Sequence, residues 1–164
     1  MASPAAAEAE DLAAPLYVAW QITNECNLAC LHCIEESGPG KAFSDELDRE
    51  QVFSVLDQLL DREVPYLSFS GGEPMLHPHF FEMVERACSR GAQLKIETNA
   101  HYLDPANAAR LKELGVKAVQ VSLDGASPRA ISRTTAVAVG LRVKTFSDRV
   151  SNSTPPNFSS RNLT

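Results

Sequence analysis

Residues 16–33 read LYVAWQITNECNLACLHC and place a predicted strand directly before a cluster of cysteines. Residues 16–23 are rich in the aromatic and β-branched side chains that favour a pleated, buried surface. The following residues bring Cys26, Cys30 and Cys33 together in one short loop. The stretch therefore predicts a strand whose carboxyl end carries three thiols.

The chain continues as an alternation of helical and strand patterns. Helices are predicted at 48–62, 78–91 and 104–115, and further strands at 66–70, 94–98 and 116–123. Asp48 with Gln51 three residues later matches a capping box, and Asp104-Pro105 is a typical helix start. Short loops between these elements predict a parallel sheet with helices packed on its face.

Composition narrows the functional classes. The chain has 164 residues, of which 44% are hydrophobic and 22% charged, with a net charge of -6. The acidic balance and the lack of a basic patch argue against a nucleic-acid partner. No apolar run approaches the roughly 20 residues that cross a bilayer, so no membrane partner is expected. The first residues lack a signal peptide's basic start and apolar middle, which favours a cytoplasmic protein.

The two ends of the chain differ in character from the middle. Residues 1–14 are rich in alanine and carry acidic side chains, and we expect a disordered lead. Residues 129–164 have no helix caps and become dominated by Ser, Asn, Thr and Pro. Such a composition buries too little apolar surface to offset the entropy of ordering, so this tail is also expected to be disordered. Residues 15–128 are the predicted folded part.

The cysteine cluster suits a metal centre better than disulfides. Disulfide frameworks are rare in a chain of this size without a secretion signal. Three thiolates in one loop can hold an iron–sulfur cluster, which usually takes four cysteines, and would leave one iron open. The alternative is a structural zinc site with His32 as the fourth ligand, although one short loop supplying all four ligands would be cramped.

Polar and glycine-rich motifs follow the other predicted strands. In Gly71-Gly72-Glu73-Pro74 the glycines lack Cβ, so their backbone can approach a ligand and adopt positive φ, and Glu73 offers a carboxylate. A tight turn before a helix is the plainer alternative. Thr98 and Asn99 end the third strand. Ser122 and Asp124 end the fourth, where an ordinary turn is equally consistent.

The remaining histidines and the fourth cysteine are not predicted to form a site. His77, His79 and His101 fall in predicted loops, and two histidines without a third ligand are seldom a metal site. Cys88 shares the spacing of a helix face with Phe81 and Val84, and is interpreted as a small core hydrophobe.

The C-x3-C-x2-C cluster after the first strand, together with Ser70-Gly71-Gly72-Glu73-Pro74, resembles the radical S-adenosylmethionine (radical SAM) superfamily. The resemblance implies that the three cysteines hold a [4Fe-4S] cluster whose fourth iron binds S-adenosylmethionine. It implies that residues 71–74 contact the methionine amino group and that Thr98 and Asn99 lie near its methionyl or ribose part. Ser122 and Asp124 would reach the ribose, and His32 the adenine.

The resemblance also implies a reaction. An electron from the cluster would cleave the sulfonium to methionine and a 5′-deoxyadenosyl radical, which takes a hydrogen atom from substrate. Residues 66–74, together with Asp124-Gly125 after the fourth predicted strand, most resemble a group that includes peptide maturases and haem-biosynthesis enzymes. A peptide, small-molecule or tetrapyrrole substrate and an electron donor such as ferredoxin or flavodoxin are therefore expected partners.

The resemblance covers residues 16–128, and only four of the six strand–helix units of the family's core are recognisable. We therefore expect an incomplete parallel (β/α) partial barrel that is truncated after the fourth strand. The tail that follows resembles the translation of a gene read out of frame. Such a chain would bind a cluster poorly and turn over little. Two alternatives stay open, an inactive fragment of such an enzyme and a non-catalytic zinc-binding module.

Overall fold

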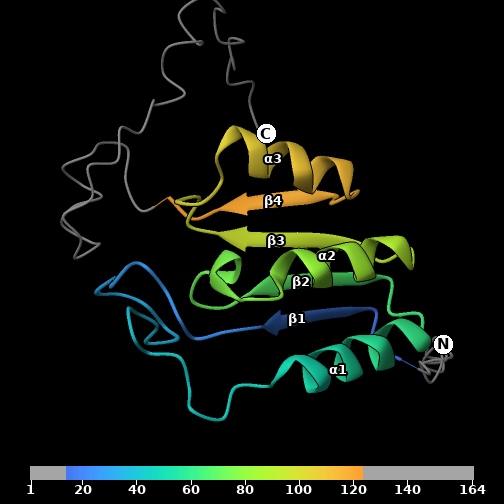
Figure 1. The fold of residues 1–164 in the computed structure, drawn as a ribbon, viewed down its shortest axis with the longest axis horizontal. Helices are drawn as coiled ribbons and strands as arrows, with labels where there is room; N and C mark the ends of the chain where they lie inside the picture. Colours follow the sequence, from blue (N-terminus) through green and yellow to red (C-terminus); the bar gives the residue numbers. More distant parts are fainter. Residues whose placement is uncertain (1–13, 124–164) are drawn as a thin grey trace, which may run out of the picture.

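The computed structural model describes residues 14–123, which form a four-stranded sheet with helices between successive strands (Figure 1). In chain order the elements are β1 (Tyr17–Gln21), α1 (Arg49–Asp61), β2 (Tyr66–Ser70), the short 3-10 helix η1 (Pro74–Leu76), α2 (Phe80–Ser89), β3 (Gln93–Thr98), α3 (Pro105–Glu113) and β4 (Ala118–Val121). The predicted alternation of strands and helices is confirmed. The expected lead, tail and role of Asp124 lie outside the described residues.

All strands are parallel, and the sheet order β1-β2-β3-β4 follows the chain. Each strand therefore pairs with its neighbour in sequence, as expected for repeated strand–helix–strand units. The carboxyl ends of all four strands meet at one edge of the sheet, which is where α/β proteins place their sites. In Figure 1 this edge is on the left, beside the blue loop that follows β1.

The core lies between one face of the sheet and the helices. Phe69 on β2, together with Leu94 and Ile96 on β3, is fully buried on this face. Helix α2 lies across β2 and β3 in Figure 1 and buries Met83 and Val84 completely. The alternation of buried and less buried residues along β3 is the period-two pattern of a strand covered on one side.

Helix boundaries follow local capping chemistry. The Asp48 carboxylate accepts a hydrogen bond from the Gln51 N–H at 2.9 Å, and the Gln51 side chain accepts from the Asp48 N–H at 3.0 Å. Asp104 caps α3 in the same way through the N–H of Asn107 at 2.7 Å. Both predicted starts are confirmed, because each depends only on residues within one turn.

The predicted start of α2 at Pro78 is wrong. Two successive turns come first, closed by His77 N–H to Pro74 O at 3.1 Å and Phe80 N–H to His77 O at 3.0 Å. The helix begins at Phe80, and its buried face consists of Phe80, Met83, Val84 and Ala87. Phe81 and Cys88 flank that face and are only partly buried against the core. Cys88 keeps its packing role, and burial raises the pKa of its thiol.

The opposite face of the sheet is polar. The Glu97 carboxylate accepts from the Ser68 hydroxyl at 2.8 Å and pairs with the Lys95 ammonium at 2.7 Å. Lys95 also donates to the Gln120 side chain at 3.4 Å. The hydrogen bond from Lys95 holds the pKa of Glu97 below its ordinary value. Lys95 and Glu97 each keep 31% of their side-chain surface exposed, so this ion pair is in contact with solvent.

The fourth strand is shorter than predicted and is largely exposed. Strand β4 runs over Ala118–Val121 and, among residues 14–123, pairs with β3 alone. Val119 and Val121 are 39% and 46% exposed. No helix within the same residues is long and apolar enough to span a membrane.

Candidate functional site

The cysteine loop begins at the carboxyl end of β1 and folds back on a second loop segment. Cys26 is buried, whereas Cys30 and Cys33 are half-buried. The Cys26 N–H donates to the carbonyl of Gly38 at 3.3 Å, and Cys33 N–H to the carbonyl of Cys30 at 3.2 Å. The four cysteines, all within the described range, form no disulfide. The loop thus offers three thiols at the edge where the strands end.

Hydrogen bonds from two different loops hold the Cys26 sulfur in place. It accepts hydrogen bonds from the Leu28 N–H at 3.4 Å and from the Asn99 side-chain amide at 3.7 Å. Burial raises the pKa of the Cys26 thiol, and the nearby charges of Glu73 and Cys30 raise it further.

The donor set suits a soft metal centre, because thiolates are the ligands of iron–sulfur clusters. Within residues 14–123, however, no group of three or more His, Cys, Asp and Glu side chains is arranged to hold a metal ion. Binding of a cluster by Cys26, Cys30 and Cys33 together stays a prediction. The same holds for the zinc alternative with His32, which lies exposed in the turn before Cys33.

Two glutamates missed by the sequence reasoning anchor this loop. The Glu46 carboxylate accepts from the Asn24 N–H at 2.7 Å and the Thr23 hydroxyl at 3.0 Å. The Glu25 carboxylate accepts from the Gly40 and Ala42 N–H groups at 2.9 and 3.2 Å. The bond from Gly40 is the main reason that the pKa of Glu25 is lowered. The Phe43 N–H, three positions away, also donates to Glu46 at 3.3 Å. The other partners named here lie 15 or more positions away, so no local motif marks the anchoring role of either glutamate.

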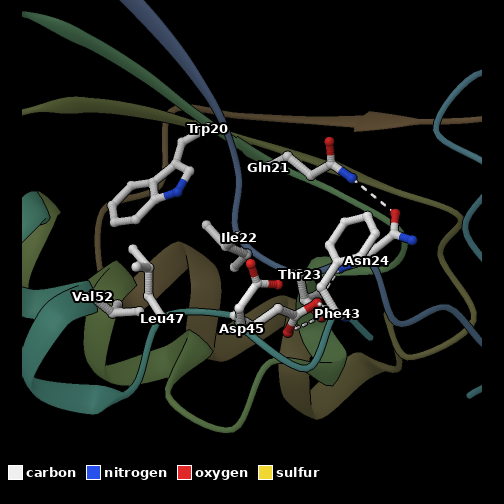
Figure 2. A pocket seen from close by; sticks show the side chains of 10 residues that line it. Trp20, Gln21, Ile22, Thr23, Asn24, Phe43, Asp45, Leu47 and Val52 are labelled. Carbon is white, nitrogen blue, oxygen red and sulfur yellow. Dashed lines mark hydrogen bonds between the residues drawn. The ribbon is translucent and has the colours of Figure 1, made fainter. Parts of the chain in front are cut away.

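A pocket of about 220 Å³ lies beside the end of β1 (Figure 2). The apolar residues lining it are Trp20, Ile22, Phe43, Leu47 and Val52, and the polar ones Gln21, Thr23, Asn24, Asp45 and Glu46. The dashed bond from Gln21 to Asn24 in Figure 2 measures 3.0 Å. Glu46, which anchors the cysteine loop, is one of the residues that line the pocket. None of the predicted cofactor-binding residues lines it.

The glycines of the Gly71-Gly72 motif are required by the cysteine loop. A Cβ on Gly71 would stand 2.3 Å from the carbonyl oxygen of Thr23, and one on Gly72 2.3 Å from that of Glu25. The Gly72 N–H donates to the Thr23 carbonyl at 2.9 Å. The sequence allowed positive φ at both glycines; Gly71 has φ +140°, whereas φ of Gly72 is not positive. The close approach expected toward a ligand is thus, in this structure, an approach of backbone to backbone.

The Glu73 side chain is completely buried. Its carboxylate accepts from the Thr98 hydroxyl at 2.8 Å, the Asn99 N–H at 2.9 Å and the Met75 N–H at 3.2 Å. Burial raises the pKa of Glu73, and the hydrogen bonds from Asn99 and Thr98 oppose that rise. The carboxylate joins the loop after β2 to the end of β3.

The other predicted site residues within the described range are Ser122 and His32. Ser122 is exposed, and its N–H donates to the Thr98 carbonyl at 3.0 Å, which places it beside the end of β3. The structure thus brings Cys26, Glu73, Thr98, Asn99 and Ser122 to one edge of the sheet. His32 lies on the outer turn of the cysteine loop.

The three loop histidines do not assemble into a metal site within residues 14–123. His77 is buried, and its Nδ1 accepts from the His79 N–H at 3.2 Å. His79 lies at the start of α2 with its Nδ1 3.5 Å from Glu82. Both histidines therefore make local contacts at the start of α2.

The fold and the position of this edge define a parallel α/β protein with a thiol-rich loop after its first strand. The sequence model described as "Radical SAM superfamily" matches residues 20–153, and the chain belongs to this family. Membership implies a [4Fe-4S] cluster and S-adenosylmethionine as cofactors. The match runs past Pro128, the last residue on which the motif resemblance rested.

Curated relatives agree with this assignment. The chain is 40% identical over 116 residues to the mycofactocin maturase MftC of Mycobacterium ulcerans, which covers 71% of this chain and 31% of that protein. It is 37% identical over 108 residues to the Fe-coproporphyrin III synthase of Methanosarcina barkeri, covering 66% of this chain and 27% of that protein. The chain spans less than a third of the length of these relatives.

Solved structures share the fold. SuiB of Streptococcus suis bound to S-adenosylmethionine superposes with a TM-score of 0.60 at 19% identity, covering 76% of this chain and 28% of SuiB. BtrN in complex with AdoMet and 2-DOIA gives a TM-score of 0.56 at 24% identity, covering 68% of this chain and 47% of BtrN. The four parallel strands with alternating helices thus match part of a radical SAM (β/α) barrel.

Proposed function

We propose that this chain carries the cofactor-binding part of a radical SAM enzyme that acts in peptide or cofactor maturation. The observation that carries the proposal is the meeting of the cysteine loop, the Gly71–Pro74 loop and the end of β3 at one edge of a parallel sheet. The identity to a mycofactocin maturase supports a peptide substrate. The identity to an Fe-coproporphyrin III synthase keeps a tetrapyrrole as the second substrate class.

Each group of residues has a distinct role in this proposal. Cys26, Cys30 and Cys33 hold the cluster, and residues 71–74 flank the cofactor from the neighbouring strand. A bound [4Fe-4S] cluster supplies the low-potential electron that cleaves S-adenosylmethionine to methionine and a 5′-deoxyadenosyl radical. Ser122, and Asp124 beyond the described residues, are the proposed ribose-side contacts, and His32 the adenine-side contact.

The protein's own contribution is to position these loops. Backbone bonds from Gly72 to Thr23 and from Glu73 N–H to Glu25 O, both 2.9 Å, hold the two loops together. Buried anchors of this kind keep reacting groups in place without reorganisation during the reaction. Because the loops interlock through backbone atoms, the site depends on local geometry more than on any one exposed side chain.

The polar face of the sheet supports binding of a polar substrate. Ser68, Lys95 and Glu97 lie on the face away from the helices, on the two central strands. Their carboxylate and ammonium groups can hydrogen-bond amide or carboxylate groups of a substrate. An external one-electron donor such as ferredoxin or flavodoxin would reduce the cluster, and a reducing cytoplasm suits four cysteines without a disulfide.

Anaerobic reconstitution tests the proposal. The chain is incubated with iron and sulfide, supplied with S-adenosylmethionine and dithionite, and assayed for methionine and 5′-deoxyadenosine by mass spectrometry. We expect a low but reductant-dependent yield of 5′-deoxyadenosine, because only four of the six strand–helix units of the family's core are recognisable, and none from a Cys30→Ala variant. Colourless protein that contains one zinc and forms no 5′-deoxyadenosine would favour a metal-binding module instead.

A further inference from the structure

The side-chain amide of Asn99 points at a predicted cluster ligand. Its Nδ2 lies 3.7 Å from the Cys26 sulfur and 3.0 Å from the Asn27 side-chain oxygen. A sulfur acceptor tolerates this longer distance because its van der Waals radius is larger than that of oxygen. Asn99 and Cys26 are 73 positions apart in the chain, so the contact exists only through the fold.

The orientation of the amide is fixed by its other neighbours. The Asn99 side-chain oxygen accepts from the His101 N–H at 2.9 Å, and an oxygen must therefore occupy that side. The nitrogen is left facing Cys26. The Asn99 backbone N–H is in turn held by the buried Glu73 carboxylate at 2.9 Å. The donor is thus oriented at both its backbone and its side chain.

An N–H group aimed at a ligating sulfur changes the energy of cluster reduction. Reduction adds negative charge that spreads onto the thiolate sulfurs, and a donor stabilises the more negative state more strongly. Removing the donor therefore makes the cluster harder to reduce. A hydrogen bond to a charged acceptor is strong enough for its loss to alter the reduction equilibrium measurably.

We propose that Asn99 is a positioning residue that donates a hydrogen bond to the Cys26 ligand sulfur and raises the reduction potential of the bound cluster. This inference rests on the proposed function, since it requires that Cys26 ligate iron. It gives Asn99 a partner other than the methionyl or ribose group that the family resemblance implies. The two roles separate when the potential is measured without S-adenosylmethionine.

The test compares Asn99→Leu and Asn99→Asp with wild type after anaerobic reconstitution, by EPR-monitored redox titration without S-adenosylmethionine. Leucine removes the donor at similar volume, and aspartate removes it and adds a negative charge. We expect about a tenfold smaller reduction equilibrium constant for the leucine variant, about 59 mV for one electron, and a larger decrease for aspartate. Asn107→Leu, which removes an amide on α3, is the matched control and should leave the potential unchanged.

The outcomes separate the two levels of the proposal. Either Asn99 variant with full cluster content and a wild-type potential would overturn the role of Asn99 while leaving the proposed function intact. If Asn99→Leu does not assemble a cluster, the reduction potential of the isosteric Asn99→Asp variant decides whether Asn99 has this role. Wild-type protein that takes up no cluster would overturn the proposed function, and this inference with it.

Discussion

The buried Glu73 carboxylate accepts a hydrogen bond from the Thr98 hydroxyl at 2.8 Å and so joins the loop after β2 to the end of β3. The same carboxylate holds the Asn99 N–H, and the Asn99 side chain reaches the Cys26 sulfur. A chain of contacts therefore runs from the loop after β2, through the end of β3, to the cysteine loop after β1. A substitution at any of these residues should therefore alter the position of the Cys26 sulfur.

Replacing Glu73 by glutamine should change how stability depends on pH. Burial raises the pKa of Glu73 above its ordinary value of 4.5, so folding favours the protonated form. Its contribution is fully present below the unfolded-state pKa and is lost as pH rises through the folded-state pKa. Denaturant unfolding across a pH series should show the free-energy advantage of wild type over Glu73→Gln decreasing upward from about pH 4.5. An advantage that grows with pH would contradict this account.

Removing the Thr98 hydroxyl should destabilise the site without changing the shape of the core. Thr98→Val is close to isosteric but leaves the buried Glu73 without one of its donors, at a cost of about 1.5–3 kcal/mol in unfolding free energy. Thr98→Ser keeps the hydroxyl and should recover most of the loss. Wild-type stability of Thr98→Val together with a loss in Thr98→Ser, measured by denaturant unfolding, would indicate that the methyl group rather than the hydrogen bond matters.

Adding a methyl group at Gly71 should separate the two interlocked loops. The new Cβ would meet the Thr23 carbonyl oxygen at 2.3 Å, and the backbone must move. We expect a loss of about 2–5 kcal/mol in unfolding free energy. Gly91→Ala is the control, because Gly91 also has positive φ, +87°, but nothing within 4 Å of the added Cβ. That variant should lose only about 1–2 kcal/mol. Similar losses for both would assign the effect to backbone conformation alone.

Truncating Glu46 should loosen the base of the cysteine loop. Glu46→Ala leaves the Asn24 N–H and the Thr23 hydroxyl without their acceptor, which should cost about 1–3 kcal/mol. Glu85→Ala removes the same charge from an exposed site on α2 and should be nearly neutral. Reconstituted protein should also lose iron faster to a chelator when Glu46 is absent. Wild-type rates of iron loss in Glu46→Ala would contradict the anchoring role.

Local chemistry made much of the fold predictable. The caps at Asp48 and Asp104 depend on neighbours three residues away, and the strand ends that carry Cys26 and Gly71 follow from the alternation of patterns. The start of α2 was misplaced because two turns after Pro74 delay the helix, and their closure depends on packing.

The supporting contacts of the site were not predictable in the same way. Glu46 lies 22 positions from Asn24 and Glu73 lies 26 positions from Asn99, so no motif in either segment reveals its partner. The reason for Gly71 was also hidden, since the atom that would clash with a side chain belongs to Thr23. Long-range contacts of this kind emerge only when the strands are aligned in the sheet.

The central claim is that three neighbouring thiols hold one iron–sulfur cluster. Its most direct test is iron and acid-labile sulfide analysis, with EPR, of anaerobically reconstituted wild type and of four single cysteine-to-alanine variants. We expect iron and sulfide in equal amounts, up to about four of each per chain, in wild type and in Cys88→Ala, and loss of the cluster signal in Cys26→Ala, Cys30→Ala and Cys33→Ala. Wild type without iron, or undiminished iron in any of those last three variants, would contradict the account.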